Sequence, residues 1–74
     1  MSKPINEQIF RQVEGVWMDA QGQVLADVIR ENELVIDDRC QFARFYDYVR
    51  DLCIYYRVAG GKIVLTFWDI SEKK

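Results

Sequence analysis

The residue types that usually perform catalysis or bind metal are few in this sequence, and their spacing suits neither task. Histidine is absent, which removes the commonest general base, the usual partner of a serine or cysteine nucleophile, and the commonest metal ligand. Cys40 and Cys53 lack the close spacing of a zinc site. Gly60-Gly61 precedes Lys62 without the rest of a phosphate-binding loop. We therefore expect a protein that is not an enzyme and that uses no metal or cofactor.

Carboxylates could supply acid–base chemistry only beside a second functional group, and the sequence shows no such convergence. Asp37 and Asp38 are adjacent, but at the start of an expected helix they are explained as N-terminal caps. A wider acidic patch could present negative charge to a basic partner. Its members are Glu31, Glu33, Asp37 and Asp38. The same residues are ordinary turn and cap residues, so both interpretations stay open.

The clearest helical pattern begins near Asp38, with Gln41 placed as in a capping box. Apolar residues then recur at helical spacing, namely Phe42, Phe45, Tyr46, Val49, Leu52 and Cys53. We predict that this helix ends near Leu52, because Ile54 and Tyr55 would fall on its charged side. In an alternative interpretation the helix continues to Ala59, with Gly60 as its C-cap.

Two segments rich in β-branched and aromatic residues, 53–58 and 62–70, flank Gly60-Gly61 and predict a hairpin. A two-residue turn puts a uniformly apolar set on one face, namely Ile54, Tyr56, Val58, Ile63, Leu65 and Phe67. The other face carries Cys53, Tyr55, Arg57, Val64, Thr66 and Trp68. We expect the apolar set to pack against the helix.

The first half of the chain gives weaker signals. Asp19 and Gly22 predict a turn that joins a strand at 13–18 to a strand at 23–29. The competing interpretation is a short helix, because apolar residues within 23–29 also fit a helical period. We further expect a third strand at 34–36, one or two helical turns at 4–12, and frayed ends at 1–3 and 71–74.

These elements predict a single α+β domain over residues 1–74. The sheet is small and antiparallel, with four or five strands that include two hairpins, and one amphipathic helix packs across it in the order ββ(β)αββ. One helix cannot cover both faces of two hairpins. The candidate protein interface left over comprises Trp17, Tyr48, Tyr55, Val64 and Trp68. The N-terminal segment, a second copy or a different protein could cover it.

Composition and charge indicate the cellular compartment and the class of partner to expect. Ten basic and twelve acidic residues give a net charge of −2, without the basic stripe of a nucleic-acid-binding domain. Two cysteines are too few for a secreted disulfide framework, which indicates free thiols and a cytoplasmic location. No segment has the length and apolar character of a membrane span, so we expect no membrane partner.

The leading hypothesis is therefore a small acidic protein that binds another protein, or a second copy of itself, stoichiometrically. It would act as an inhibitor, adaptor or assembly factor, like many phage and mobile-element accessory proteins. One alternative is a nucleic-acid-associated regulator that uses the helix side bearing Arg39, Arg50 and Arg57. Another is a non-catalytic subunit of an enzyme complex.

Overall fold

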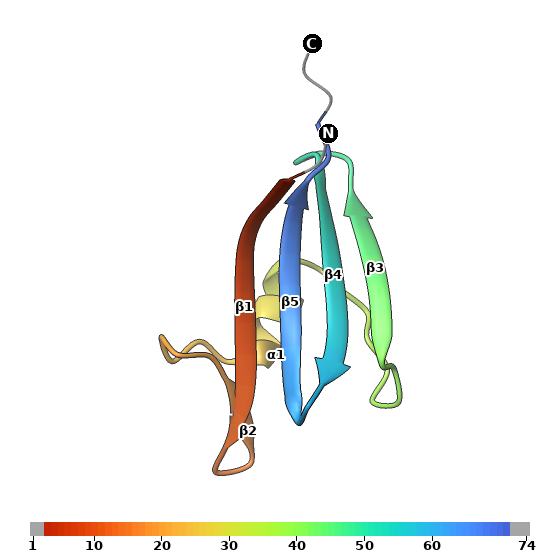
Figure 1. Ribbon diagram of the computed structural model, residues 1–74. Coiled ribbons are helices and arrows are strands. Elements are labelled where there is room, and N and C mark those ends of the chain that lie inside the picture. Colours follow the sequence, from red (N-terminus) through yellow and green to blue (C-terminus); the bar gives the residue numbers. More distant parts are fainter. Residues whose placement is uncertain (1–2, 72–74) are drawn as a thin grey trace.

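The computed structural model describes residues 3–71, which form a five-stranded antiparallel sheet with a short helix on one face (Figure 1). The elements along the chain are β1 (Lys3–Val13), β2 (Val16–Met18), α1 (Leu25–Glu31), β3 (Phe42–Asp47), β4 (Leu52–Ala59) and β5 (Lys62–Asp69). The strand order across the sheet is β2-β1-β5-β4-β3. The predicted α+β class and antiparallel sheet are confirmed, although the elements follow the order ββαβββ.

The C-terminal hairpin forms as predicted. β4 and β5 pair so that Val58 lies opposite Ile63, with Gly60 and Gly61 as the two turn residues. Their φ angles of 57° and 76° are both left-handed, as a type I′ turn requires and as glycine readily adopts. The apolar set predicted for one face belongs to the core cluster or packs against it. Of the ends expected to fray, Lys3 begins β1, and residues 1–2 and 72–74 lie outside the described residues.

The predicted helix from Asp38 to Leu52 is wrong, because this segment forms β3 between two turns. Every residue of β3 pairs with a residue of β4. Before the strand, the Asp37 carboxylate accepts a hydrogen bond from the backbone N–H of Arg39 (3.0 Å), so it closes a turn and caps no helix. Pairing with a neighbouring strand has thus overridden a local helical period, as tertiary context often does.

Residues 4–12, predicted as helical turns, are also strand. They lie within β1, which pairs with β5 up to Phe10 and with β2 beyond it. Glu14 and Gly15, with φ angles of 51° and 81°, make the tight turn between β1 and β2. Phe10 is completely buried in the core. Pairing with β5 and β2 and the burial of Phe10 favour the extended conformation of β1 over a short helix.

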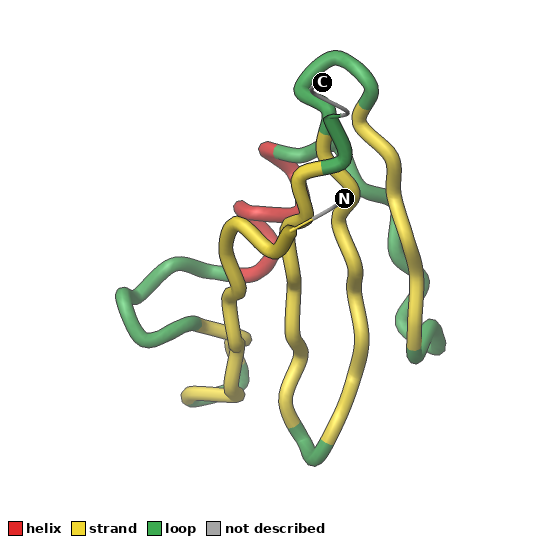
Figure 2. Tube along the Cα trace, turned by 45° about the horizontal axis from the view of Figure 1, so that its top comes forward, coloured by secondary structure: helices red, strands yellow, loops and turns green. Residues whose placement is uncertain are grey.

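The predicted hairpin of residues 13–18 with 23–29 is wrong in its second strand. β2 pairs with β1, and most of the second segment is α1, which was the competing interpretation. The turn itself is confirmed, because the Asp19 carboxylate accepts two backbone N–H bonds across it and Gly22 has a φ of 84°. This loop projects beside the sheet and leads the chain into α1 (Figure 2).

The third strand expected at 34–36 does not form, and these residues are an irregular segment that follows the end of α1. Glu33 is left-handed, with a φ of 56°. Its N–H donates to the Arg30 carbonyl (3.1 Å), and the Leu34 N–H donates to the Ile29 carbonyl (3.0 Å). This is the bond pair of a Schellman motif, which satisfies carbonyls at a helix C-terminus. The motif turns the chain so that Leu34 enters the core from an irregular segment.

The core lies between α1 and one face of the sheet. Its buried members are Phe10, Leu25, Val28, Leu34, Ile54, Tyr56, Ile63 and Leu65. Fully burying one such apolar side chain contributes about 1.5–3 kcal/mol. No charged side chain is buried within residues 3–71. Over the same residues, no helix is long and apolar enough to cross a membrane.

Candidate functional site

The sheet face opposite α1 is covered by no other element of residues 3–71, and Figure 1 looks onto it. We call it the open face and define it by three rows of residues that cross β1, β5, β4 and β3 in that order. The first row is Pro4, Trp68, Cys53 and Tyr46; the second is Glu7, Thr66, Tyr55 and Arg44; the third is Ile9, Val64, Arg57 and Phe42. Alternation along the strands, interrupted on β1 by an irregularity between Pro4 and Asn6, separates these residues from the core.

The open face carries four aromatic rings, those of Phe42, Tyr46, Tyr55 and Trp68. Tyr55 lies between two of them, with ring centroids 5.7 Å from Trp68 and 6.1 Å from Phe42. Tyr46 stacks on Tyr48, in the turn after β3, with centroids 5.9 Å apart. Phe42 and Tyr46 remain 54% and 50% exposed. The rings therefore form an extended aromatic layer from β5 to the edge of the sheet, with much of its area in solvent.

Two small residues of the open face are buried by side chains of the same face. Cys53 and Val64 are only 2% and 6% exposed. Burial raises the pKa of the Cys53 thiol above its usual value, and the positive charge of Arg44 offsets this only in part. Because the thiolate is the nucleophilic form, we expect Cys53 to be an unreactive, packed thiol.

Trp68 has an unsatisfied polar atom. Its indole Nε1 is buried and has no hydrogen-bond partner among the residues described. An unpaired buried donor costs about 1–3 kcal/mol. The Trp68 ring contacts Tyr55 in a tilted arrangement, with an interplanar angle of 34°, and no hydrogen bond among the residues described fixes its orientation.

The three rows contain the charged residues Glu7, Arg44 and Arg57, all exposed, and Lys62 lies on the same side of the sheet two residues before Val64. Glu7 accepts a long hydrogen bond from the Thr66 hydroxyl (3.5 Å). Within residues 3–71 the ion pairs involve Arg30, Arg39 and Arg50, so neither arginine of the open face has a carboxylate partner.

The structure splits the predicted interface residues between two sides. Tyr55, Val64 and Trp68 lie together on the open face, and Tyr48 adjoins them through Tyr46. Trp17 lies on the other side, where it packs against the core cluster. It lines a hollow of about 380 Å³ with α1 residues and with Asp37 and Asp38. Trp17 therefore belongs to the helix-covered side and cannot share a binding surface with Trp68.

The predicted acidic patch is divided as well. Glu31 and Glu33 line a different hollow, of about 320 Å³, beside the turn between β3 and β4. Asp37 pairs loosely with Arg39 (3.9 Å). No group of three or more acidic or cysteine residues in the described part of the chain is arranged to hold a metal ion.

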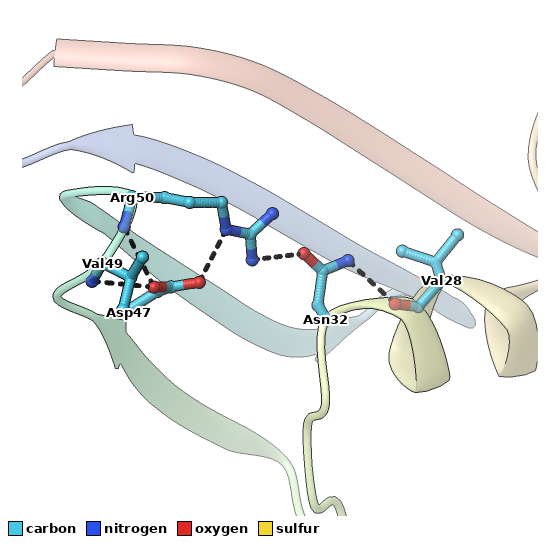
Figure 3. A network of polar contacts seen from close by, with 5 residues as sticks. All are labelled: Val28, Asn32, Asp47, Val49 and Arg50. Atoms are coloured by element: carbon cyan, nitrogen blue, oxygen red, sulfur yellow. Dashed lines mark hydrogen bonds and ion pairs between the residues drawn. The ribbon is translucent and has the colours of Figure 1, made fainter.

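The turn after β3 is tied to α1 by a polar network (Figure 3). The Asp47 carboxylate accepts bonds from the Arg50 side chain (2.6 Å) and from the N–H groups of Val49 and Arg50. Arg50 also donates to the Asn32 side chain (2.9 Å), which in turn donates to the Val28 carbonyl (2.8 Å). The side-chain bond from Arg50 is the main cause that lowers the pKa of Asp47. Arg50 therefore links the turn after β3 to the end of α1.

The arginines expected on one helix side are dispersed, because that helix does not form. Arg39 precedes β3, Arg50 lies in the network just described, and Arg57 is in β4. Sequence reasoning in turn missed Phe42, Arg44 and Tyr46 as a surface. The helical period places Phe42 and Tyr46 on a buried helix face, and residues 42–47 show no apolar–polar alternation that would indicate a strand.

The fold and this face define a class: a small antiparallel α+β domain with one face covered by its own helix and one aromatic face open. No protein-family model, curated protein or solved structure matches the chain, so its function has to be inferred from its own residues.

Proposed function

We propose that this chain is a non-enzymatic interaction module that binds a protein stoichiometrically through the open face. One observation carries the proposal: Phe42, Tyr46, Tyr55 and Trp68 share a sheet face that no element of residues 3–71 covers, and the rings of Phe42 and Tyr46 are 54% and 50% exposed. Tyrosine, tryptophan and arginine are the residues that most often dominate binding energy at protein interfaces. An inhibitor, adaptor or assembly factor would use such a surface.

The charge pattern favours protein over nucleic acid as the partner. Arg44 and Arg57 flank the rings, and rings with arginine on a sheet can stack nucleic-acid bases. The whole chain nevertheless carries a net charge of −2, and binding to phosphate backbones depends on cationic residues. A cytoplasmic setting fits the two free thiols, Cys40 and Cys53.

Paired surface variants test the proposal. The tagged chain is used to capture partners from the source extract, and affinity for the purified partner is then measured by calorimetry. We expect Tyr46→Ser and Phe42→Ser each to weaken binding at least about tenfold, which corresponds to ~1.4 kcal/mol. The control Val35→Ser removes an apolar residue that is 87% exposed and lies outside the open face, so it should change affinity less than about twofold.

Two results would overturn the proposal. In the first, the open-face variants bind the captured protein as well as the wild type does. In the second, a labelled single-stranded oligonucleotide binds at physiological salt with a steep salt dependence in an anisotropy titration, and Tyr46→Ser abolishes that binding. The second result would assign the open face to nucleic acid.

A further inference from the structure

The middle row of the open face has opposite charges at its two ends. Glu7 occupies the β1 end and Arg44 the β3 end, with Thr66 and Tyr55 between them. Both charged residues are exposed. Within residues 3–71 Arg44 has no ion pair, and the Thr66 bond to Glu7 is long at 3.5 Å. If a second copy of the row is placed against it in the reverse direction, each charged end therefore meets a residue of opposite charge.

We propose that the partner of the open face is a second copy of this chain, stacked face to face about a twofold axis parallel to the strands. This rests on the proposed function, namely that the open face binds protein. An axis between β4 and β5 places the row against its reverse, so each Glu7 meets the Arg44 of the other copy. An axis across the strands would place Glu7 on Glu7 and Arg44 on Arg44, which like-charge repulsion disfavours.

At the ends of the outer rows apolar side chains would meet, and at the centre of the third row Arg57 would face Val64 of the other copy. Ile9 would face Phe42 of the other copy, and Pro4 would face Tyr46. Ile9, Phe42 and Tyr46 are each at least 40% exposed, so their contact would remove apolar area from water on both copies. Stacked sheets pack about 10 Å apart with strands within roughly 30° of each other. The aromatic layer would become the interior of a sandwich, with α1 outside each sheet.

Pairing through the edge strand β3 is the competing way to join two copies. Nothing in the described part of the chain pairs with the outer edge of β3, and such edges can add a strand. Edge pairing would extend the sheet, leave the aromatic layer exposed, and keep Glu7 on β1 far from the contact. The charge of Glu7 therefore separates the two arrangements.

Light scattering after size exclusion, across a range of protein concentrations, tests the proposal. The wild type should approach twice the chain mass of 8.8 kDa. Glu7→Arg and Arg44→Glu should each remain at that monomer mass, since the row then carries one sign at both ends, and the dissociation constant should rise on the order of 100-fold. An equimolar mixture of the two variants should recover the dimer, because each row then faces a row of opposite charge.

Controls separate this inference from the proposed function. Glu31→Arg and Arg39→Glu make the same charge changes off the open face and should dimerise like the wild type. A wild type that stays monomeric at all concentrations, or a mixture that does not recover the dimer, would overturn the second copy as partner. If Tyr46→Ser still weakened capture of another protein, the open face would remain a binding surface. A dimer insensitive to Glu7→Arg but disrupted at β3 would assign the contact to the edge.

Discussion

The two faces of this sheet are built from alternate residues of the same strands and reach burial by different means. On β4, Ile54 and Tyr56 point toward α1, whereas Cys53 and Tyr55 point to the open face. The covered face combines aliphatic residues with four rings, those of Phe10, Phe45, Tyr56 and Phe67, and is enclosed by an element of its own chain. The open face has large rings whose neighbours Cys53 and Val64 are buried among them without a second layer. Burial of a residue thus does not by itself identify the face that holds the fold together.

The difference also separates stability from recognition. Aliphatic side chains packed against a helix gain from full removal from water. Rings that stay half exposed gain less on folding and keep apolar area available for a partner, and the hydroxyl of Tyr46 keeps that ring compatible with water. We therefore expect substitutions on the covered face to change the free energy of unfolding most strongly.

The largest expected effect contrasts Leu65→Ala with Tyr46→Ala. Leu65 is fully buried in the core, so truncation leaves a cavity and should lower the free energy of unfolding by about 2–5 kcal/mol. Tyr46 is half exposed, and its truncation should cost less than about 1 kcal/mol. Urea denaturation followed by tryptophan fluorescence measures both, at concentrations where the chain is monomeric. Equal losses in the two variants would show that the open face is a second core.

Cysteine substitution probes the self-buried part of the open face. Cys53→Ser places a hydroxyl in a site with little solvent and should cost about 1–3 kcal/mol of unfolding free energy. The matched control is Cys40→Ser, which should cost less because the new hydroxyl can keep the bond that Cys40 Sγ makes to the Phe42 carbonyl (3.2 Å).

Alkylation tests the difference between Cys53 and Cys40 independently. Under native conditions iodoacetamide should modify half-buried Cys40 well before Cys53, whose pKa is raised by burial. Peptide mass spectrometry resolves the two sites. Rapid modification of native Cys53 would mean that the rings above it open readily, and the open face would then be less ordered than we describe.

The parts of the fold that sequence predicted correctly are those in which local and tertiary signals agree. Gly60-Gly61 fits a type I′ turn, and the alternation on both sides selects the same core face, so β4 and β5 could be predicted. Residues 42–52 carry a helical period and no apolar–polar alternation, so only pairing with β4 makes residues 42–47 a strand. β1 was missed for a similar reason, because its partner β5 lies at the other end of the chain.

The candidate site was predictable in part for the same reason. Tyr55, Val64 and Trp68 follow from the hairpin register alone, and the structure places them together. Phe42, Arg44 and Tyr46 required the identity of the third strand, which no local pattern supplies. Trp17 was misplaced because its partner strand was taken to follow it, whereas β2 pairs with β1 before it. Errors in strand pairing therefore became errors in which residues share a surface.

The smallest expected effect concerns the helix that makes the covered face different from the open one. Glu33 holds the left-handed position of the Schellman motif at the end of α1, where a side chain is disfavoured and glycine is not. Glu33→Gly should therefore raise the free energy of unfolding by about 0.5–1 kcal/mol. Glu31→Gly, the same substitution on the last residue of α1, should lower it by a similar amount.

Opposite signs for these two glycine variants in urea denaturation would show that the backbone conformation at the C-terminal turn of α1 limits the free energy of unfolding. A loss of stability in Glu33→Gly would contradict this, and would mean that the Glu33 side chain contributes more through its surroundings near Asp47 and Arg50 than its backbone conformation costs.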